Sequence, residues 1–384
     1  MTERPTPAKR STRGVGLVGS GFMGRSHALA YATASVVFPL ARPPRLAFLA
    51  DANEDLAARA ARELGFARHT GDWRTLVADP EVDLVDVTAP NRLHKPIALE
   101  ALKAGKPVYC EKPLAPTAKD AKAMADAAAE ADLPTFVGFN YLRNPMSRLA
   151  REIVESGEIG EPYNFRGIHA EDYMSDPAGS WTWRLDPKGG GGAAADLGSH
   201  IIAMARFLMG PIERLTADLT TRFSPRPDAG GTMRPVEVDD EARALVRFQS
   251  GAVGTIEASW IATGRKMHLA FEITGTRGSI RLNMERMNEL RLYVAGGKAG
   301  RGGYALIPAG PEHPDYAPFC PAPGHQLGFN EVKAIEVKDI LAALSGGPAF
   351  LPDFGEAAEV QAVVDAVLMA GREGRWVAPQ EAFG

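Results

Sequence analysis

Four consecutive glycines, residues 189–192, stand shortly before a carboxylate and an imidazole that are four residues apart, Asp196 and His200. On a helix, residues at this spacing share one face. A carboxylate beside an imidazole can orient it and tune its uptake of a proton, and glycines let the backbone approach a ligand closely. A Gly-rich loop before a helix with a solvated polar pair would show the same pattern. Asp196 and His200 are therefore candidates for moving a proton, with both interpretations open at this point.

A second glycine pattern, Gly19-Ser20-Gly21-Phe22-Met23-Gly24, follows an apolar run over 15–19 and precedes a helical pattern over 25–34. This is G-x-G-x-x-G in the strand–turn–helix context typical of dinucleotide binding. Gly19 permits the tight turn, Gly21 lets a pyrophosphate approach the backbone, and Gly24 lets helix and strand pack closely. The free N–H groups of the helix start then face the phosphates.

An acidic residue, Asp51, ends the second apolar strand. It would accept hydrogen bonds from the ribose hydroxyls of the adenosine and repel a 2′-phosphate, which favours NAD over NADP. Its spacing from the glycines is longer than usual, and we assign the excess to a surface loop over 35–45. Asp51 could instead cap the next helix, a role that Asn53 can also fill. Arg45 and Arg59 lie near in sequence, so NADP stays open.

A lysine follows the short strand 108–110 in the segment Glu111-Lys112-Pro113. This strand ends at the edge where a nicotinamide would lie. A lysine held there could donate to a substrate hydroxyl oxygen and stabilise the alkoxide as hydride leaves. A solvated surface lysine is the ordinary alternative.

Strands and helices alternate through the first third of the chain, which predicts a doubly wound parallel sheet. The turn with Pro90, Asn91 and His94 follows the strand 84–88 at the carboxyl edge, where such sheets bind ligands. The pattern offers no explanation for Asp86 inside that strand.

From Asn140 the pattern changes to longer, alternating strands, typical of an antiparallel sheet with one covered face. We predict the strands 162–170, 214–223, 242–249, 252–261, 268–274 and 278–283 and the helices 145–156, 330–344 and 355–371. We therefore divide the chain into a dinucleotide-binding Rossmann domain, 1–139, and an α+β domain for substrate binding and oligomerisation, 140–384, built on a large, mostly antiparallel sheet.

Four sequence blocks together are similar to the Gfo/Idh/MocA oxidoreductases, the family of glucose–fructose oxidoreductase and inositol dehydrogenase. The blocks are 16–24 with His27, 89–94, 104–113 with the Glu-Lys-Pro segment, and the glycine run with Asp196 and His200. The resemblance covers nearly the whole chain. The family commonly has Asn-Tyr-Arg where this chain has Asn140-Tyr141-Leu142-Arg143, so the arginine comes one place later.

The resemblance implies a site at the junction of the two domains. It implies that Lys112 contacts substrate and nicotinamide ribose, that Asp196 and His200 lie across the reacting carbon with the imidazole as base, and that the peptide before Pro113 is often cis. The residues expected to bind the cofactor are Gly19, Gly21, Phe22, Met23, Gly24, Asp51, Pro90, Asn91, His94, Glu111 and Lys112. The residues expected to bind substrate are Lys112, Asn140, Tyr141, His169, Trp183, Arg184, Asp196 and His200.

Several of these residues have competing interpretations. Trp183 could form a wall against a sugar ring or anchor its loop. Arg184 could pair with a substrate oxygen or a local aspartate. His169 and Glu171 share a face at strand spacing, but we expect Glu171 to lie at a solvated edge.

Composition excludes several classes of protein. The formal net charge of the 384 residues is -4, which argues against a nucleic-acid binder, and no run of about 18 apolar residues suggests a membrane span. Two cysteines are too few for a disulfide framework, so we expect a reducing, cytoplasmic location. Residues 1–13 are polar and resemble a frayed tail, not a signal peptide.

The segment 301–326 is long and rich in Pro and Gly. Its His313, Cys320 and His325 fit no standard metal spacing, so we expect no metal and interpret the segment as a substrate lid or an oligomer arm. A homodimer or homotetramer is expected, mainly from the resemblance.

The sequence therefore predicts an NAD(P)-dependent dehydrogenase acting on a secondary alcohol of a sugar, inositol or similar cyclic polyol. Lys112 would orient the hydroxyl, and His200, held by Asp196, would take its proton. Two alternatives remain open: a redox-neutral hydrolase or epimerase that retains NAD, and a non-enzymatic NAD-binding regulator.

Overall fold

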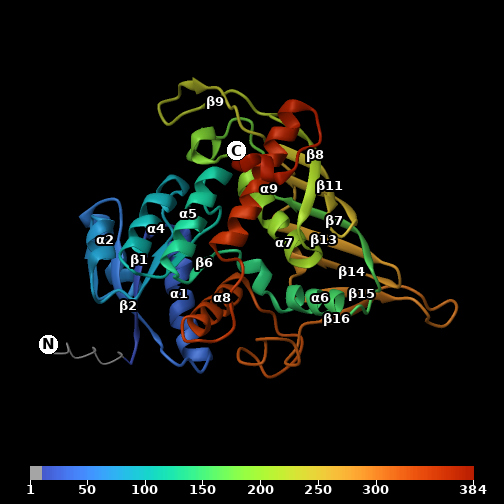
Figure 1. Ribbon diagram of the computed structural model, residues 1–384, viewed down its shortest axis with the longest axis horizontal. Helices are drawn as coiled ribbons and strands as arrows, with labels where there is room; N and C mark the ends of the chain where they lie inside the picture. Colours follow the sequence, from blue (N-terminus) through green and yellow to red (C-terminus); the bar gives the residue numbers. More distant parts are fainter. Residues whose placement is uncertain (1–10) are drawn as a thin grey trace.

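A parallel sheet of six strands forms the first part of the chain, in the order β3-β2-β1-β4-β5-β6 (Figure 1). The computed structural model describes residues 11–384. The strands are β1 (Arg13–Val18), β2 (Pro44–Ala50), β3 (Arg68–Thr70), β4 (Leu84–Val87), β5 (Val108–Cys110) and β6 (Thr135–Val137). The central strands are buried along their whole length because helices cover both faces. The predicted doubly wound sheet is confirmed.

Five helices connect these strands: α1 (Phe22–Val37), α2 (Glu54–Leu64), α3 (Trp73–Ala78), α4 (His94–Lys103) and α5 (Ala118–Ala131). Local signals set their ends. Asn53 caps α2 by accepting from Leu56 N at 3.0 Å, and Gly65 ends it in a left-handed conformation. The strand order reverses between β1 and β4, which places a ligand crevice at their carboxyl ends.

The second sheet has eight strands in the order β16-β15-β14-β13-β7-β12-β11-β8, antiparallel except for the β7–β12 pair. Its strands are β7 (Pro162–Ala170), β8 (Ile212–Thr220), β11 (Glu241–Phe248), β12 (Val253–Ser259), β13 (His268–Gly275), β14 (Gly278–Asn283), β15 (Glu289–Val294) and β16 (Ala305–Pro308). A separate two-residue pair, β9 (Arg226–Pro227) and β10 (Met233–Arg234), forms a small ribbon. Side chains of β11 alternate between buried and exposed, as expected for a sheet covered on one face.

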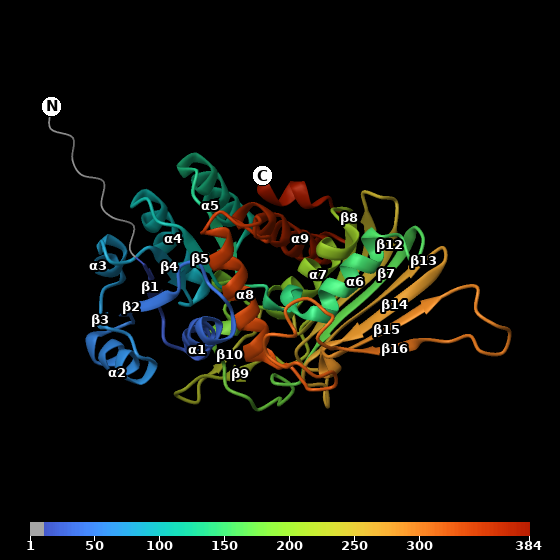
Figure 2. The same cartoon turned by 90° about the horizontal axis from the view of Figure 1, so that it is seen from below.

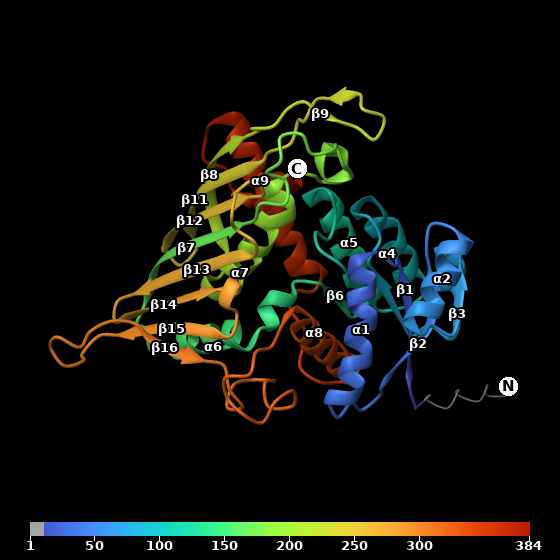
Figure 3. The same ribbon diagram turned by 180° about the vertical axis from the view of Figure 1, so that it is seen from behind.

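Four helices lie between the sheets or on the inner face of the second: α6 (Pro145–Glu155), α7 (Ser199–Met209), α8 (Phe329–Ala343) and α9 (Phe354–Glu373). Figures 2 and 3 show that α8, although it comes late in the chain, lies beside α1 of the first domain. Helix α9 packs on both α5 and β8. The two domains therefore share a continuous interior, and the division at residue 139 stays a prediction.

The structure corrects some predicted elements. The loop predicted over 35–45 is shorter than expected, because α1 continues to Val37 and β2 begins at Pro44. Strands β15 and β16 were not predicted, since β16 is a short edge strand that contains a proline and β15 has only a weak alternation of apolar residues. Of the predicted tail, residues 1–10 lie outside the described residues. Within residues 11–384 no helix is both long and apolar enough to cross a membrane.

Candidate active site

A cleft of about 790 Å³ opens at the junction of the two domains, beside the carboxyl edge of the parallel sheet. All the residues predicted for the site line this cleft except Gly24. A Cβ on Gly24 would lie 2.1 Å from Gly19 O, so this glycine serves the close packing of α1 against the strand end. The tertiary structure thus brings the two sets of predicted residues, from both domains, to one place.

The glycine turn leaves an open cradle at the start of α1. Gly19 has a φ of +102°, which glycine adopts without strain. Among the described residues, no atom lies within 4 Å of a Cβ built on Gly21, and no side chain caps the helix start. Free N–H groups and empty space at a helix N-terminus suit a pyrophosphate, so the residues present fit a dinucleotide.

Asp51 lies directly after β2 and faces the glycine turn. Its Oδ2 accepts hydrogen bonds from the backbone N of Ser20, at 2.8 Å, and from the Ser20 hydroxyl. The cap of α2 is Asn53, so the alternative role for Asp51 as that cap is wrong. Its carboxylate is instead bonded to the glycine turn.

Lys112 reaches across the junction to the second domain. Its Nζ lies 2.9 Å from Oδ1 and 2.9 Å from the backbone O of Asp196. The Lys112–Pro113 peptide bond is cis. A lysine with its ammonium group held at the cleft between two oxygens is not a solvated surface lysine, and that alternative is wrong.

Asp196 lies in a π-helical turn, Ala194–Gly198, that leads directly into α7. Besides Lys112, its carboxylate accepts from Tyr173 Oη at 2.8 Å and Arg184 Nε at 3.1 Å. Although burial opposes ionisation, the charges of Lys112 and Arg184 hold the pKa of Asp196 well below its usual range. Asp196 is therefore a fixed anion that organises cationic and hydroxyl donors.

His200 lies in the first turn of α7, and its ring contacts those of Phe139, Tyr141 and His169 at centroid distances of 5.8, 5.1 and 5.4 Å. Within residues 11–384 neither ring nitrogen has a hydrogen-bond partner, so the predicted orientation of His200 by Asp196 is wrong. Three other donors already occupy that carboxylate. Burial, followed by the positive charge of Lys112, lowers the pKa of His200 well below its usual value. The imidazole is therefore neutral at pH 7 and free to accept a proton.

Two further residues of the cleft follow His169 at strand spacing. His169 Nε2 lies 3.2 Å from Glu171 Oε1, and its Nδ1 lies 3.0 Å from Leu197 O. Glu171 lines the cleft, so its predicted place at a solvated edge is wrong. Tyr173, which also lines the cleft, was missed. The spacing 169, 171, 173 is the signal that could have found it.

Two residues predicted to bind the cofactor, His94 and Glu111, have their polar side-chain atoms hydrogen-bonded to other protein groups. His94 is buried, with Nε2 2.8 Å from Ala89 O and Nδ1 3.0 Å from Pro113 O, and so joins the two strand-end loops. Glu111 is also buried, and its Oε1 is bonded to His27 and Lys333. Both line the cleft, but their polar atoms are largely taken.

The remaining substrate candidates border the open side of the cleft. Trp183 is 47% exposed, and the guanidinium of Arg184 lies 4.5 Å over its ring. Asn140 is buried, and its Nδ2 is a donor without a partner in the part of the chain that the structure describes. Arg143 is turned away, toward Asp339 and the ring of Phe350, and does not line the cleft.

The segment 301–326 contributes nothing to the cleft. None of its residues lines the cavity, and buried Tyr316 and the Asp315 ion pairs with Arg148 and Lys338 anchor it on α6 and α8. The structure therefore gives no support to its interpretation as a substrate lid. In the part of the chain that the structure describes, no group of three His, Cys, Asp or Glu residues could hold a metal ion.

A dinucleotide cradle facing an ammonium, a neutral imidazole and a fixed carboxylate defines a nucleotide-dependent oxidoreductase. Residues 13–139 match the family model "Oxidoreductase family, NAD-binding Rossmann fold", and residues 147–281 match "GFO/IDH/MocA C-terminal domain". The chain belongs to the Gfo/Idh/MocA family of oxidoreductases, as the sequence blocks predicted.

Named relatives share the whole architecture. Levoglucosan dehydrogenase of Pseudarthrobacter phenanthrenivorans is 40% identical over 94% of this chain and 97% of its own. A structure of levoglucosan dehydrogenase in complex with NADH and levoglucosan is 40% identical, with a TM-score of 0.93 over 96% of this chain and 99% of that one. An NAD-binding oxidoreductase from Klebsiella pneumoniae is 41% identical, with a TM-score of 0.92 over the same shares.

Proposed function

We propose that this protein is an NAD-dependent dehydrogenase that oxidises a secondary alcohol of a sugar, an anhydrosugar or a cyclic polyol. The observation that carries the proposal is the position of Lys112, whose ammonium group stands in the cleft beside neutral His200 and is held by Asp196. Kinship with levoglucosan dehydrogenase supports the substrate class.

The residues divide the proton chemistry between them. Lys112 donates a hydrogen bond to the substrate hydroxyl oxygen and stabilises its developing negative charge. His200 accepts the hydroxyl proton, because its low pKa keeps the imidazole neutral and its nitrogens have no hydrogen-bond partner among residues 11–384. Asp196 holds the lysine and stays ionised throughout. Bound NAD would supply the redox chemistry as the acceptor of the hydride from the carbinol carbon, and the products would be a ketone, NADH and a proton.

The lining of the cleft suits a polyhydroxylated ring. Lys112, Arg184 and the free Nδ2 of Asn140 are donors, and Glu171 is an acceptor. Trp183 offers an aromatic face to the apolar side of a sugar. Hydrogen-bond partners of both kinds around one aromatic wall favour a sugar or polyol over an apolar alcohol.

The cofactor assignment to NAD rests on the acidic end of β2. Asp51 is bonded to Ser20 of the glycine turn, and a carboxylate at the end of the second strand disfavours the 2′-phosphate of NADP. The residue both accepts from ribose hydroxyls and repels a phosphate. Contact with the adenosine ribose is thus the proposed role of Asp51.

Steady-state assays with NAD and a panel of levoglucosan, aldoses and inositols test the proposal. Reduced cofactor should accumulate with at least one of these compounds and depend on both substrates. Product formed without net NADH would point to the redox-neutral alternative, and NAD binding without turnover of any compound would point to a regulator.

The outer face of the eight-stranded sheet supports a homodimer or homotetramer. This face contains a concave depression with a volume of about 910 Å³. Arginines and glutamates of β7, β11, β12, β13, β14 and β15 line the depression. Charges of both signs on one face permit self-complementary pairing about a two-fold axis. Sedimentation velocity should show the assembly, and Arg243→Glu should weaken it.

The free thiols of Cys110 and Cys320 support a reducing, cytoplasmic location.

A further inference from the structure

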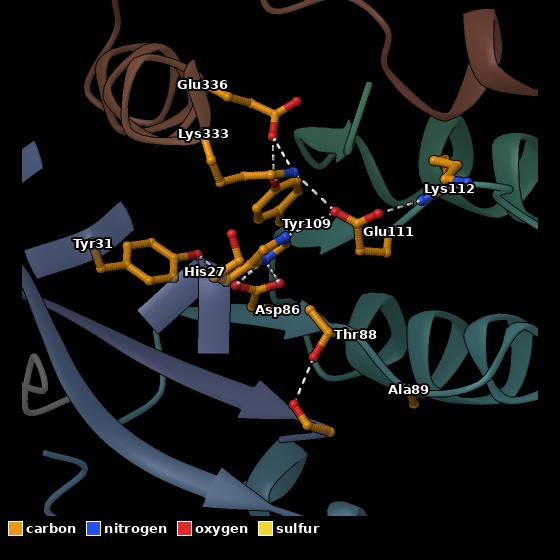
Figure 4. Close-up of polar contacts among 12 residues, drawn as sticks. His27, Tyr31, Asp86, Thr88, Ala89, Tyr109, Glu111, Lys112, Lys333 and Glu336 are labelled. Atoms are coloured by element: carbon orange, nitrogen blue, oxygen red, sulfur yellow. Dashed lines mark hydrogen bonds and ion pairs between the residues drawn. The ribbon is translucent and has the colours of Figure 1, made fainter. Parts of the chain in front are cut away.

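Five buried side chains of alternating charge form a ladder beneath the cleft: Asp86, His27, Glu111, Lys333 and Glu336 (Figure 4). His27 Nδ1 lies 3.0 Å from Asp86 Oδ1, and its Nε2 lies 2.8 Å from Glu111 Oε1. The Nζ of Lys333 lies 2.9 Å from Glu111 Oε1 and 2.7 Å from Glu336 Oε2. We call these five residues the charge ladder. It gives Asp86, unexplained by the sequence, a partner.

Tyrosines close both ends of the charge ladder. Tyr31 Oη donates to Asp86 Oδ2 at 2.9 Å, and Tyr109 Oη donates to Glu336. The Tyr109 ring also stacks on His27 at a centroid distance of 4.7 Å. Burying this many charges is costly unless each is paired, so every member depends on its neighbours.

The alternation of charge requires His27 to be protonated. Burial opposes this, but the carboxylates of Asp86 and Glu111 prevail and raise the pKa of His27 to about 9. Both ring nitrogens then carry protons, and each donates to a carboxylate. Two cations thus separate three anions along the ladder.

The middle of the ladder is joined to the active site. Glu111 uses Oε1 for His27 and Lys333, and its Oε2 accepts from the backbone N of Lys112 at 3.2 Å. The carboxylate also fits against Gly138, where a Cβ would lie 2.5 Å from Oε1. Its position is therefore closely defined, and it fixes the backbone from which the lysine side chain extends.

Helix α8 supplies two members of the ladder, Lys333 and Glu336. Lys333 is 222 residues from Glu111 in the sequence, yet its ammonium group is fully buried against that carboxylate. The ladder thus joins α1, β4, the residue after β5 and α8, and of its five members only Glu111 borders the cleft.

We propose that the charge ladder is a positioning device for Lys112, in which Lys333 and Glu336 act through Glu111 without touching substrate or cofactor. This rests on the proposed function, because it assigns Lys112 to the hydroxyl of the substrate. Loss of the Lys333 cation leaves the carboxylates of Glu111 and Glu336 facing each other. Their repulsion displaces Glu111 and, with it, the backbone of Lys112.

The test compares Lys333→Met with Lys338→Met, a lysine of the same helix whose ion pairs with Asp315 and Asp339 lie outside the ladder. Turnover is divided by the number of NADH-binding sites, which counts folded protein. We expect Lys333→Met to lower kcat about 30-fold with KM for NAD nearly unchanged, because a small displacement of a catalytic group is costly. Lys338→Met should stay within about twofold of the wild type, because the ion pairs of Lys338 contact neither the ladder nor the cleft.

A second variant covers the case in which Lys333→Met does not fold. The double variant Lys333→Met with Glu336→Gln removes one charge of each sign, so we expect it to fold. If the single variant Lys333→Met also folds, kcat of the double variant should be at least about threefold higher than that of the single variant. If the single variant does not fold, the double variant should still be slower than the wild type. In that case a double variant as fast as the wild type would overturn the proposal. If the single variant folds, a double variant no faster than Lys333→Met would overturn repulsion between carboxylates as the cause.

A second measurement does not depend on turnover. Acetylation of Lys112 by an N-hydroxysuccinimide ester, measured by mass spectrometry against exposed Lys103, should be faster in Lys333→Met because Asp196 holds the displaced lysine less firmly. Unchanged acetylation with unchanged kcat per site would overturn the proposal, as would a lower kcat with unchanged acetylation. A wild type that oxidises no sugar would refute the proposed function, and acetylation alone would then decide on the ladder.

Discussion

The Nζ of Lys112 and the carboxylate of Asp196 meet at 2.9 Å across the junction of the two domains. Lys112 lies two residues after the end of β5 in the nucleotide-binding sheet, and Asp196 belongs to the π-helical turn before α7. This ion pair fixes the ammonium group at the place where both domains contribute to the cleft. Each domain alone would present half of the site.

Lys112→Met should remove the donor to the substrate oxygen and leave the cradle for the dinucleotide intact. We expect kcat to fall by roughly 10²–10⁴-fold, the usual range for lost acid–base and electrostatic help. NADH affinity, measured by fluorescence titration, should change little. Lys95→Met, a surface lysine paired with Asp120, is the matched control. Wild-type turnover in Lys112→Met would contradict the proposed role.

The pH profile tests His200 as the base. Because burial and the charge of Lys112 lower its pKa, the neutral form persists below pH 6.5, its ordinary value. The acidic limb of kcat/KM should therefore lie well below that pH, and His200→Ala should lower kcat by roughly 10²–10⁴-fold and abolish the limb. His69→Ala, at an exposed histidine, should leave the profile unchanged. A limb centred at or above 6.5 would argue against a neutral imidazole.

Asp51→Ser should shift the choice of cofactor. Removing the carboxylate removes its repulsion of a 2′-phosphate, so the ratio of kcat/KM for NAD to that for NADP should fall by about tenfold or more. Asp55→Ser, in the exposed first turn of α2, is the control. An unchanged ratio would exclude Asp51 from ribose recognition.

Asp239→Asn should stabilise the protein in a pH-dependent manner. Burial raises the pKa of Asp239 from 3.8 to about 6. Its Oδ2 accepts from Ala194 N in the π-helical turn, and its Oδ1 has no partner among the described residues. A carboxyl whose pKa is higher in the folded state loses stability as pH rises from about 4 through 6. Asparagine keeps the acceptor without the charge.

The size of this effect follows from the shift in pKa. The shift in pKa corresponds to about 3 kcal/mol. We expect Asp239→Asn to gain about 2 kcal/mol in unfolding free energy at pH 8 and little at pH 4. Urea unfolding at both values measures it. Asp228→Asn, in an exposed loop, should show no such difference. Equal effects at both values of pH would count against a buried charge.

Local sequence patterns determined the class of fold and the main parts of the site. The glycine turn, the strand over 162–170 and the Glu-Lys-Pro segment are read from residues within one turn or strand of each other, where spacing alone sets geometry. Lys112, Asp196 and His200 were identified in this way, and the cleft contains all three.

Only the tertiary structure decided which of these groups are partners. The spacing of Asp196 and His200 suggested a pair. In the folded chain the carboxylate of Asp196 instead accepts hydrogen bonds from Tyr173, Arg184 and Lys112, which is 84 residues away. The sequence pattern showed no partner for Asp86 inside its strand, and the tertiary structure supplies His27 as that partner.

The physical reason is that the energy of a buried charge depends on whatever lies within a few ångströms, and chain folding brings distant segments there. Lys333 meets Glu111 because α8 returns to the first domain, which no local pattern records. The sequence by itself determined the candidates for chemistry. The packing of the two domains decided their protonation, their partners and their common site.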